Sequence, residues 1–275
     1  MSKFDLVVLD LDGTLLDPDR EAPVRPAVKA AVAEALQRGV GITFATGRTW
    51  NYARQRIAEL GLSLPMVSSH GATLVAADGT VLSEQRLDDG LSRQLAARAH
   101  DLPEVFCFYY RNLATGQLLI RQNRALEAMD VYHHLLGPET EVVDDLGAFL
   151  DDHQVLKFVV FDEHAEAPQR WGRWAGPLAH VSRTHHLLVE GTAPGIDKGV
   201  GVRRLIDHLQ LDPARVLAVG DNFNDLPMFA AVGTSVAMGQ SPDPVKKAAT
   251  WIAPTFADDG VAAALRHFVL GEGER

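Results

Sequence analysis

The chain has 275 residues, 47% of them hydrophobic, so it can bury a substantial core and form one large domain or two smaller ones. Its formal charge of −10 argues against a general nucleic-acid-binding surface, which needs clustered Lys and Arg. The single cysteine, Cys107, lies in an apolar stretch and excludes an intrachain disulfide, which suits a reducing compartment. Because no stretch resembles a signal peptide or a membrane span, we expect a cytoplasmic protein that does not act at a membrane.

The N-terminal part alternates short apolar runs with helical patterns. Residues 4–9 form a run rich in Val and Leu that ends in acidic residues, which predicts a buried parallel strand. A helix that stops at Gly39 is expected next, followed by a second strand over 40–45. Another helix stops at Gly61, before a third strand over 66–68. This alternation predicts a parallel sheet with helices on both faces.

The pattern changes after the third strand. A hairpin is expected around the turn at Asp78 and Gly79, between two short apolar runs. Beyond it, the apolar runs 105–110, 118–120 and 155–161 are separated by helical stretches. We interpret this part of the chain as an inserted α+β domain.

Strand and helix alternate again in the C-terminal part. A helix is expected over 198–209, strands over 216–219 and 235–238, and a last helix over about 261–269. The sequence therefore predicts a doubly wound, Rossmann-like parallel-sheet core of the α/β class with an α+β insertion. The expected boundaries are residues 1–82 and 191–275 for the core and 83–190 for the inserted domain.

Two carboxylates, Asp10 and Asp12, follow the first strand, with Gly13 where the chain must turn. Two nearby carboxylates repel each other, which favours either a bound divalent metal or one raised pKa. Either arrangement suits phosphoryl transfer. One carboxylate can attack phosphorus, and the other can protonate the leaving oxygen and later activate water.

Three further polar sites follow a predicted strand or begin a helix. Thr46 ends the second strand, where its hydroxyl and amide can hold a phosphoryl oxygen. Lys198 begins a helix and can neutralise charge on a transferring phosphoryl group. Residues 221–225 supply carboxylates and amides, which are oxygen ligands that suit Mg²⁺. Ligands of such sheets bind at the carboxyl ends of the strands, so these residues predict one site.

With these four motifs in this order, the chain resembles phosphatases of the haloacid dehalogenase superfamily, and the place of the insertion resembles the type IIB cap of the Cof-like subgroup. The resemblance covers nearly the whole chain. It implies that Asp10 is the nucleophile and Asp12 the general acid and base. It also implies that Thr46 and Lys198 bind the phosphoryl group.

The same resemblance implies Mg²⁺ as the cofactor. The ion would be held by the Asp10 side chain, the Asp12 backbone carbonyl and the Asp221 side chain. Asp225 would not bind the ion directly but would help to hold its ligands in place and would orient Lys198.

The neighbours of these residues leave alternatives open. Arg48, which follows Thr46 and Gly47, either contacts the substrate phosphate or forms a surface ion pair. Asn224 is expected to touch phosphate or metal-bound water. His70 stands where many relatives have Asn, so a leaving-group contact and a loop-stabilising hydrogen bond are both considered. The expected phosphate-binding residues are Thr46, Gly47, Arg48, Lys198 and Asn224.

The resemblance implies a magnesium-dependent hydrolase of small phosphomonoesters, sugar phosphates first, that works through an aspartyl phosphate. One alternative is a phosphomutase of the same fold. Another is a non-catalytic phosphate-binding or regulatory protein. Neither a nucleic acid nor a membrane is an expected partner, because the chain is acidic and lacks an apolar span.

Overall fold

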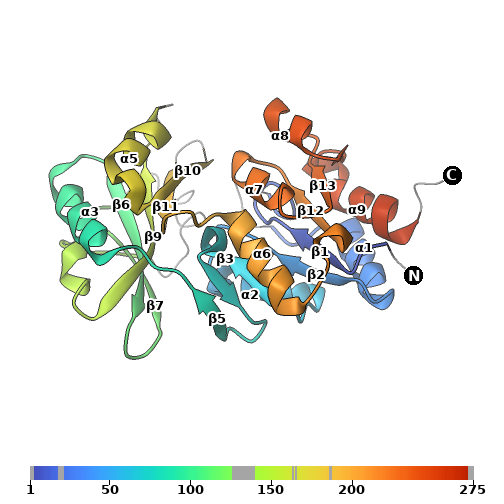
Figure 1. Ribbon diagram of the computed structural model, residues 1–275, viewed down its shortest axis with the longest axis horizontal. Helices are drawn as coiled ribbons and strands as arrows, with labels where there is room; N and C mark the ends of the chain where they lie inside the picture. The colour runs from blue at the N-terminus through green and yellow to red at the C-terminus, as the bar shows by residue number, and fades with distance from the viewer. Residues whose placement is uncertain are drawn as a thin grey trace. The chain divides into compact units, whose positions relative to one another are not determined.

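The computed structural model describes residues 3–17, 22–125, 140–162, 164, 166–185 and 188–271. The chain forms two compact units, residues 1–83 with 197–275 and residues 84–196 (Figure 1). The second boundary differs from the expected one, since residues 191–196 lie in the inserted unit and not in the core. The reason is that strand β11 (Leu188–Thr192) pairs with β9 (His153–Phe161) and β10 (His180–His185) of that unit.

The first unit contains a five-stranded parallel sheet in the order β14-β13-β12-β1-β2. The chain winds outward from β1 in both directions, which is the doubly wound arrangement that the sequence predicts. Its strands are β1 (Leu6–Leu9), β2 (Gly41–Phe44), β12 (Val216–Gly220), β13 (Thr234–Ala237) and β14 (Trp251–Ile252).

Helices cover both faces of this sheet, as β1 shows. Val7 and Leu9 pack into one hydrophobic cluster with helices α1, α2 and α9, whereas Leu6 and Val8 pack into another with α6, α7 and α8. This alternation explains the continuous apolar run in the sequence, because both faces of the strand are buried. The helices are α1 (Pro26–Gln37), α2 (Trp50–Leu60), α6 (Lys198–Leu209), α7 (Leu226–Phe229), α8 (Asp243–Ala248) and α9 (Gly260–Leu265), which continues as a π-helical turn (Arg266–Leu270).

The expected third strand is not a full member of the parallel sheet. One parallel bridge, between Ala45 and Val67, connects it to the segment after β2. The strand instead pairs antiparallel with its successor in a three-stranded sheet, because the chain turns back sharply at Ser69 and His70, which both have positive φ. The strands are β3 (Met66–Ser68), β4 (Thr73–Val75) and β5 (Val81–Glu84), and the last two form the expected hairpin.

The second unit is a six-stranded mixed sheet in the order β10-β11-β9-β6-β7-β8. Phe106, Phe108 and Tyr110 form one hydrophobic cluster with residues of helices α3 (Asp89–Asp101) and α5 (Ala167–Ala175). The predicted α/β core with an α+β insertion is thus confirmed. The remaining strands are β6 (Val105–Asn112), β7 (Leu118–Gln122), β8 (Thr140–Val142), β9 (His153–Phe161) and β10 (His180–His185).

Within the described ranges, no helix has both the length and the apolar character that a membrane span requires.

Candidate active site

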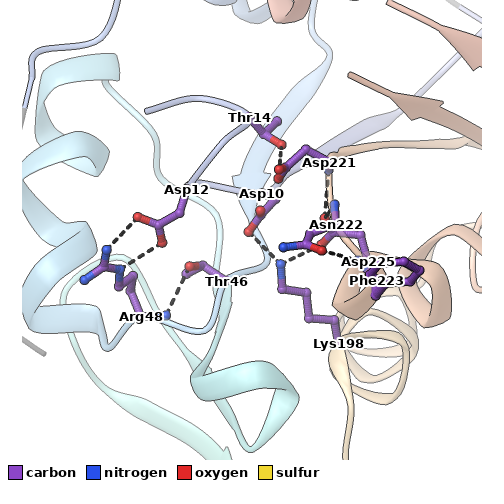
Figure 2. A network of polar contacts seen from close by, with 10 residues as sticks. All are labelled: Asp10, Asp12, Thr14, Thr46, Arg48, Lys198, Asp221, Asn222, Phe223 and Asp225. Atoms are coloured by element: carbon purple, nitrogen blue, oxygen red, sulfur yellow. Dashed lines mark hydrogen bonds and ion pairs between the residues drawn. The ribbon is translucent and has the colours of Figure 1, made fainter. Parts of the chain in front are cut away.

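Asp10 directly follows β1 and is almost completely buried. Its backbone N–H donates to the Val219 carbonyl of β12 at 2.9 Å, which fixes the residue at the carboxyl end of the sheet. The Asp10 carboxylate accepts a hydrogen bond of 2.6 Å from the Lys198 ammonium, which donates a second bond of 2.6 Å to Asp225 (Figure 2). One buried lysine therefore connects two carboxylates that are far apart in the sequence.

Lys198 is buried because of the way helix α6 begins. The side chain of the N-cap residue Asp197 accepts the Val200 N–H at 2.8 Å and so fixes the first turn. Gly199 packs against the backbone of α7, where an added Cβ would lie 2.3 Å from the Pro227 carbonyl oxygen. This close packing of α6 on α7 holds the lysine beside the turn that follows β12.

Asp225 organises that turn. Its Oδ2 accepts the backbone N–H groups of Asp221 at 2.8 Å and Asn222 at 3.0 Å, while its Oδ1 accepts from Lys198. Asn222 in turn caps the short 3₁₀ helix Phe223–Asp225, so that the two side chains form a capping box. Both Asp225 oxygens are thus used to hold the turn and the lysine.

The turn after Asp12 packs against Asp221. Gly13 has a φ of +84°, and an added Cβ would lie only 2.4 Å from Oδ2 of Asp221. The Thr14 hydroxyl donates to the other Asp221 oxygen at 3.2 Å. Glycine is therefore needed at position 13 both for its backbone conformation and for the close approach of a carboxylate.

Thr46 lies in the loop after β2 and is fully buried. Its hydroxyl accepts the Arg48 N–H at 3.1 Å, which leaves the hydroxyl proton available for a ligand. The His70 ring packs on Gly47, where an added Cβ would come within 2.2 Å of Nε2. The His70 N–H also donates to the Thr46 carbonyl at 3.0 Å, so the segment that contains His70 supports this loop.

Arg48 pairs with Asp12. Its Nε and Nη2 donate to the two Asp12 oxygens at 2.8 and 2.7 Å (Figure 2). The Arg48 side chain is only 9% exposed, so this contact is not the surface ion pair that the sequence left open. It is a largely buried, bidentate pair. Although Asp10 and Asp12 are close in sequence, their side chains have different partners.

The charge around Asp10 is unbalanced. Burial, followed by the nearby carboxylate of Asp225, raises the pKa of Asp10 to about 7, although the Lys198 ammonium opposes the rise. Burial also raises the pKa of Asp221 well above its usual value, and the carboxylates of Asp10 and Asp225 raise it further. Burial alone lowers the pKa of Lys198, but the two carboxylates outweigh that effect and raise it, so the lysine stays charged.

The side chains fit a divalent cation. Oxygens of Asp10, Asp221 and Asp225 all lie within 4.8 Å of one another. A cation beside Asp10 and Asp221 would relieve the repulsion that contributes to both raised pKa values. In the described part of the chain, the buried Asn224 side-chain oxygen accepts no hydrogen bond, as expected of an atom that serves a ligand or a water molecule. Such a set of oxygen donors is typical of Mg²⁺ sites.

The structure places the residues singled out in the sequence in two groups. The first surrounds Lys198 and contains Asp10, Asp221 and Asp225. The second is the chain of contacts from Thr46 through Arg48 to Asp12.

Sequence reasoning missed two contacts of these groups. The first is the hydrogen bond from the Thr14 hydroxyl to Asp221. A hydroxyl directly after the acidic turn is the sequence signal that could have predicted it. The second contact joins Arg48 to Tyr52, whose ring centroid lies 4.3 Å from the guanidinium carbon. Its position in the first turn of α2, four residues after Arg48, is the signal that could have found it.

The chain is similar to several known enzymes. It is 26% identical to the putative phosphatase YkrA of Bacillus subtilis, over 96% of this chain and 98% of that protein. It is 25% identical to the 5-amino-6-(5-phospho-D-ribitylamino)uracil phosphatase YcsE of Bacillus subtilis, over 96% of each. A third relative, the chloroplastic endoribonuclease YBEY of Arabidopsis thaliana, is 25% identical over 98% of this chain, which spans 47% of that relative's length.

Solved structures share the fold. The phosphatase BT1666 from Bacteroides thetaiotaomicron superposes with a TM-score of 0.80 at 24% identity, over 96% of this chain and 95% of that one. The subclass IIB sugar phosphatase BT4131 superposes with a TM-score of 0.80 at 20% identity, over 96% and 98%. A sequence profile of haloacid dehalogenase-like hydrolases matches residues 7–265. The chain therefore belongs to the haloacid dehalogenase-like hydrolases, as its four motifs predicted.

Proposed function

We propose that this hydrolase removes phosphate from small phosphomonoesters through a phosphorylated Asp10. The observation that carries the proposal is the bond of Lys198 to both Asp10 and Asp225 at the carboxyl end of a parallel sheet, with Asp221 close by. This arrangement offers one nucleophilic carboxylate and a fixed positive charge for a phosphoryl group. The names of the related phosphatases support the same reaction.

The reaction has two steps in this proposal. A carboxylate oxygen of Asp10 attacks phosphorus, the bond from phosphorus to the leaving oxygen breaks, and Asp12 gives that oxygen a proton. Water then attacks the aspartyl phosphate and loses its proton to Asp12, which releases inorganic phosphate and restores Asp10. Throughout both steps, Thr46 and Lys198 hold the phosphoryl oxygens. Their burial keeps these donors in place.

The proposed cofactor is Mg²⁺. Asp10 and Asp221 would hold it with their side chains, and Asp12 with its backbone carbonyl. Asp225 is better suited to orienting Lys198, because both of its oxygens already accept hydrogen bonds. When bound, the ion supplies positive charge that offsets the charge of the carboxylates and of the substrate phosphate.

We further propose sugar phosphates as the first substrates to test, and residues 84–196 as a cap that contributes the contacts to the non-phosphate part. The support is the resemblance in the motifs and the name of the sugar phosphatase that shares the fold. The cytoplasm remains the predicted compartment.

The test is phosphate release from a panel of phosphomonoesters with and without Mg²⁺. Asp10→Asn removes the nucleophile and is expected to lower kcat on the order of 10⁴-fold. Asp5→Asn is the matched control, because Asp5 lies at the opposite end of β1 and pairs with Arg215 on the surface.

Each outcome decides between candidate functions. Release that needs Mg²⁺ and Asp10, but not Asp5, supports the proposal. Release that survives Asp10→Asn contradicts the assignment of the nucleophile. Turnover that appears only with an added sugar bisphosphate would identify a phosphomutase. No turnover under any of these conditions would favour a phosphate-binding protein.

A further inference from the structure

Arg48 and Asp12 form a bidentate ion pair, which is more directional than an ion pair with a single hydrogen bond. Two parallel N–H···O bonds, at 2.8 and 2.7 Å, join one edge of the guanidinium to both carboxylate oxygens. A bidentate pair fixes the plane of the carboxyl group as well as its position. The donors on this edge of Arg48 therefore point at Asp12 (Figure 2).

Contacts with its neighbours hold Arg48 itself in place. Its guanidinium carbon lies 4.3 Å from the centroid of the Tyr52 ring, which is a cation–π contact with the first turn of α2. Its backbone N–H donates to the Thr46 hydroxyl, and its carbonyl accepts the Ser69 N–H at 3.1 Å. The arginine is thus a rigid support, whereas the Asp12 side chain is 28% exposed and follows the end of a strand.

We propose that Arg48 is a positioning residue that holds the Asp12 carboxyl group in place for proton transfer to the leaving oxygen, and that it is not a phosphate contact. The inference rests on the proposed function, in which Asp12 is the acid and base. Arg48 gains and loses nothing in the reaction. The bond from phosphorus to the leaving oxygen breaks, and that oxygen takes the proton that Asp12 carries into this step. A protonated carboxyl group keeps acceptor lone pairs on both oxygens, so Asp12 can hold this proton and still accept the two bonds from Arg48.

This role predicts a dependence on the leaving group. An alkoxide such as that of a sugar needs a proton as it leaves, whereas nitrophenolate is stable without one. Loss of Arg48 lets the Asp12 side chain adopt other rotamers, so proton transfer suffers and attack by Asp10 does not. The value of kcat/KM reports the first step, so it should fall for alkyl phosphates much more than for aryl phosphates.

The experiment measures kcat/KM for p-nitrophenyl phosphate and for the best alkyl phosphate of the panel. The variants are Arg48→Ala, Arg48→Lys, Asp12→Ala and the Asp12→Ala/Arg48→Ala double variant. With Arg48→Ala we expect a fall of about 10- to 100-fold for the alkyl phosphate and about threefold or less for the aryl phosphate. Arg48→Lys should recover only part of the loss, because lysine cannot form the bidentate pair.

The ratio of the two kcat/KM values is the decisive quantity, since it does not depend on the fraction of folded enzyme. In the Asp12→Ala background, removal of Arg48 should change the alkyl value by about twofold or less, because a residue that acts through Asp12 has nothing left to position.

Three results would overturn the inference. They are an equal fall for both substrates, a full Arg48→Ala effect in the Asp12→Ala background, and weaker inhibition by inorganic phosphate in Arg48→Ala, all of which indicate a phosphate contact. Failure of the proposed function looks different, because the wild-type enzyme would then hydrolyse neither substrate.

Discussion

Each of the two units contains a buried lysine that bonds to one or more carboxylates, but the balance of charge around the two lysines differs. In the second unit, Lys157 of β9 donates to Glu190 of β11 at 2.5 Å, and the Thr184 hydroxyl donates to the other Glu190 oxygen. The Tyr109 ring lies 4.3 Å from the ammonium. In this contact one ammonium group meets one carboxylate, so the Lys157–Glu190 pair taken by itself carries no net charge.

In the first unit, by contrast, Lys198 bonds to two carboxylates, and a third, that of Asp221, lies beside them. The excess of negative charge contributes to the raised pKa values of Asp10 and Asp221. The comparison teaches that a buried lysine is not by itself a functional signal. What marks the site is charge that the protein leaves uncompensated, because a cation and a phosphoryl group can then complete it.

The largest effect should come from removing each lysine. Lys157→Met leaves Glu190 buried and should lower the free energy of unfolding by about 3–5 kcal/mol. Lys198→Met leaves two carboxylates and should lower it by at least as much, while also abolishing turnover. Urea unfolding at neutral pH and kcat of the folded fraction measure the two effects.

A second substitution sharpens this contrast. Lys157→Met/Glu190→Met replaces the whole pair with apolar side chains and should recover most of the lost stability. Lys198→Met/Asp225→Leu should not, because Asp10 still lacks its cation and the turn after β12 loses its acceptor. Equal recovery in both double variants would mean that the two lysines play the same structural role.

A smaller effect should follow from pH and magnesium. The pKa of Asp10 is raised from 3.8 to about 7, so between these values the folded protein holds a proton that the unfolded chain has released. Metal-free stability should therefore fall as the pH rises through this window. Mg²⁺ needs the ionised carboxylate, so its stabilisation should grow over the same window, to about 2.7 kcal/mol at a hundredfold excess over Kd.

Thermal unfolding in EDTA and in Mg²⁺, from about pH 5 to pH 8, measures both trends. Asp10→Asn should flatten them, whereas Lys157→Met should lower Tm without changing the increment from Mg²⁺. A magnesium increment that is the same at every pH would contradict the role given to Asp10.

The sequence predicted these features unequally, for physical reasons. Strands such as β1 and β12 are visible as Val- and Leu-rich runs because both of their faces are buried. Strand β14, at Trp251–Ile252, is too short to show a period, and α8 has only one buried residue, Val245. Strand β3 belongs to the three-stranded sheet because the chain turns back at Ser69 and His70, which have positive φ values. The residue types at these positions do not reveal such values.

The candidate site shows the same division. Asp10 and Asp221 could be placed together because each follows a parallel strand, and the ends of these strands meet at one edge of the sheet. The partner of Arg48 could not, since it depends on a side-chain rotamer that spacing does not determine. The motif therefore singled out Arg48 as a residue of interest, whereas its bonds to Asp12 became visible only in the structure.

The smallest effect is expected from substituting one tightly packed glycine in each unit. In Gly13→Ala the new Cβ meets the Asp221 carboxylate and the φ is +84°, whereas in Gly191→Ala it meets the Phe158 ring at 2.1 Å. Both should lower the free energy of unfolding by about 1–3 kcal/mol, which urea titration measures. Only Gly13→Ala should also weaken the stabilisation by Mg²⁺. The reason is that its new Cβ displaces the carboxylate of Asp221, a proposed magnesium ligand, whereas the Cβ at position 191 displaces an aromatic ring. If Gly191→Ala reduced the magnesium increment as strongly, the metal response would report general loosening of the fold and not the charge around Lys198.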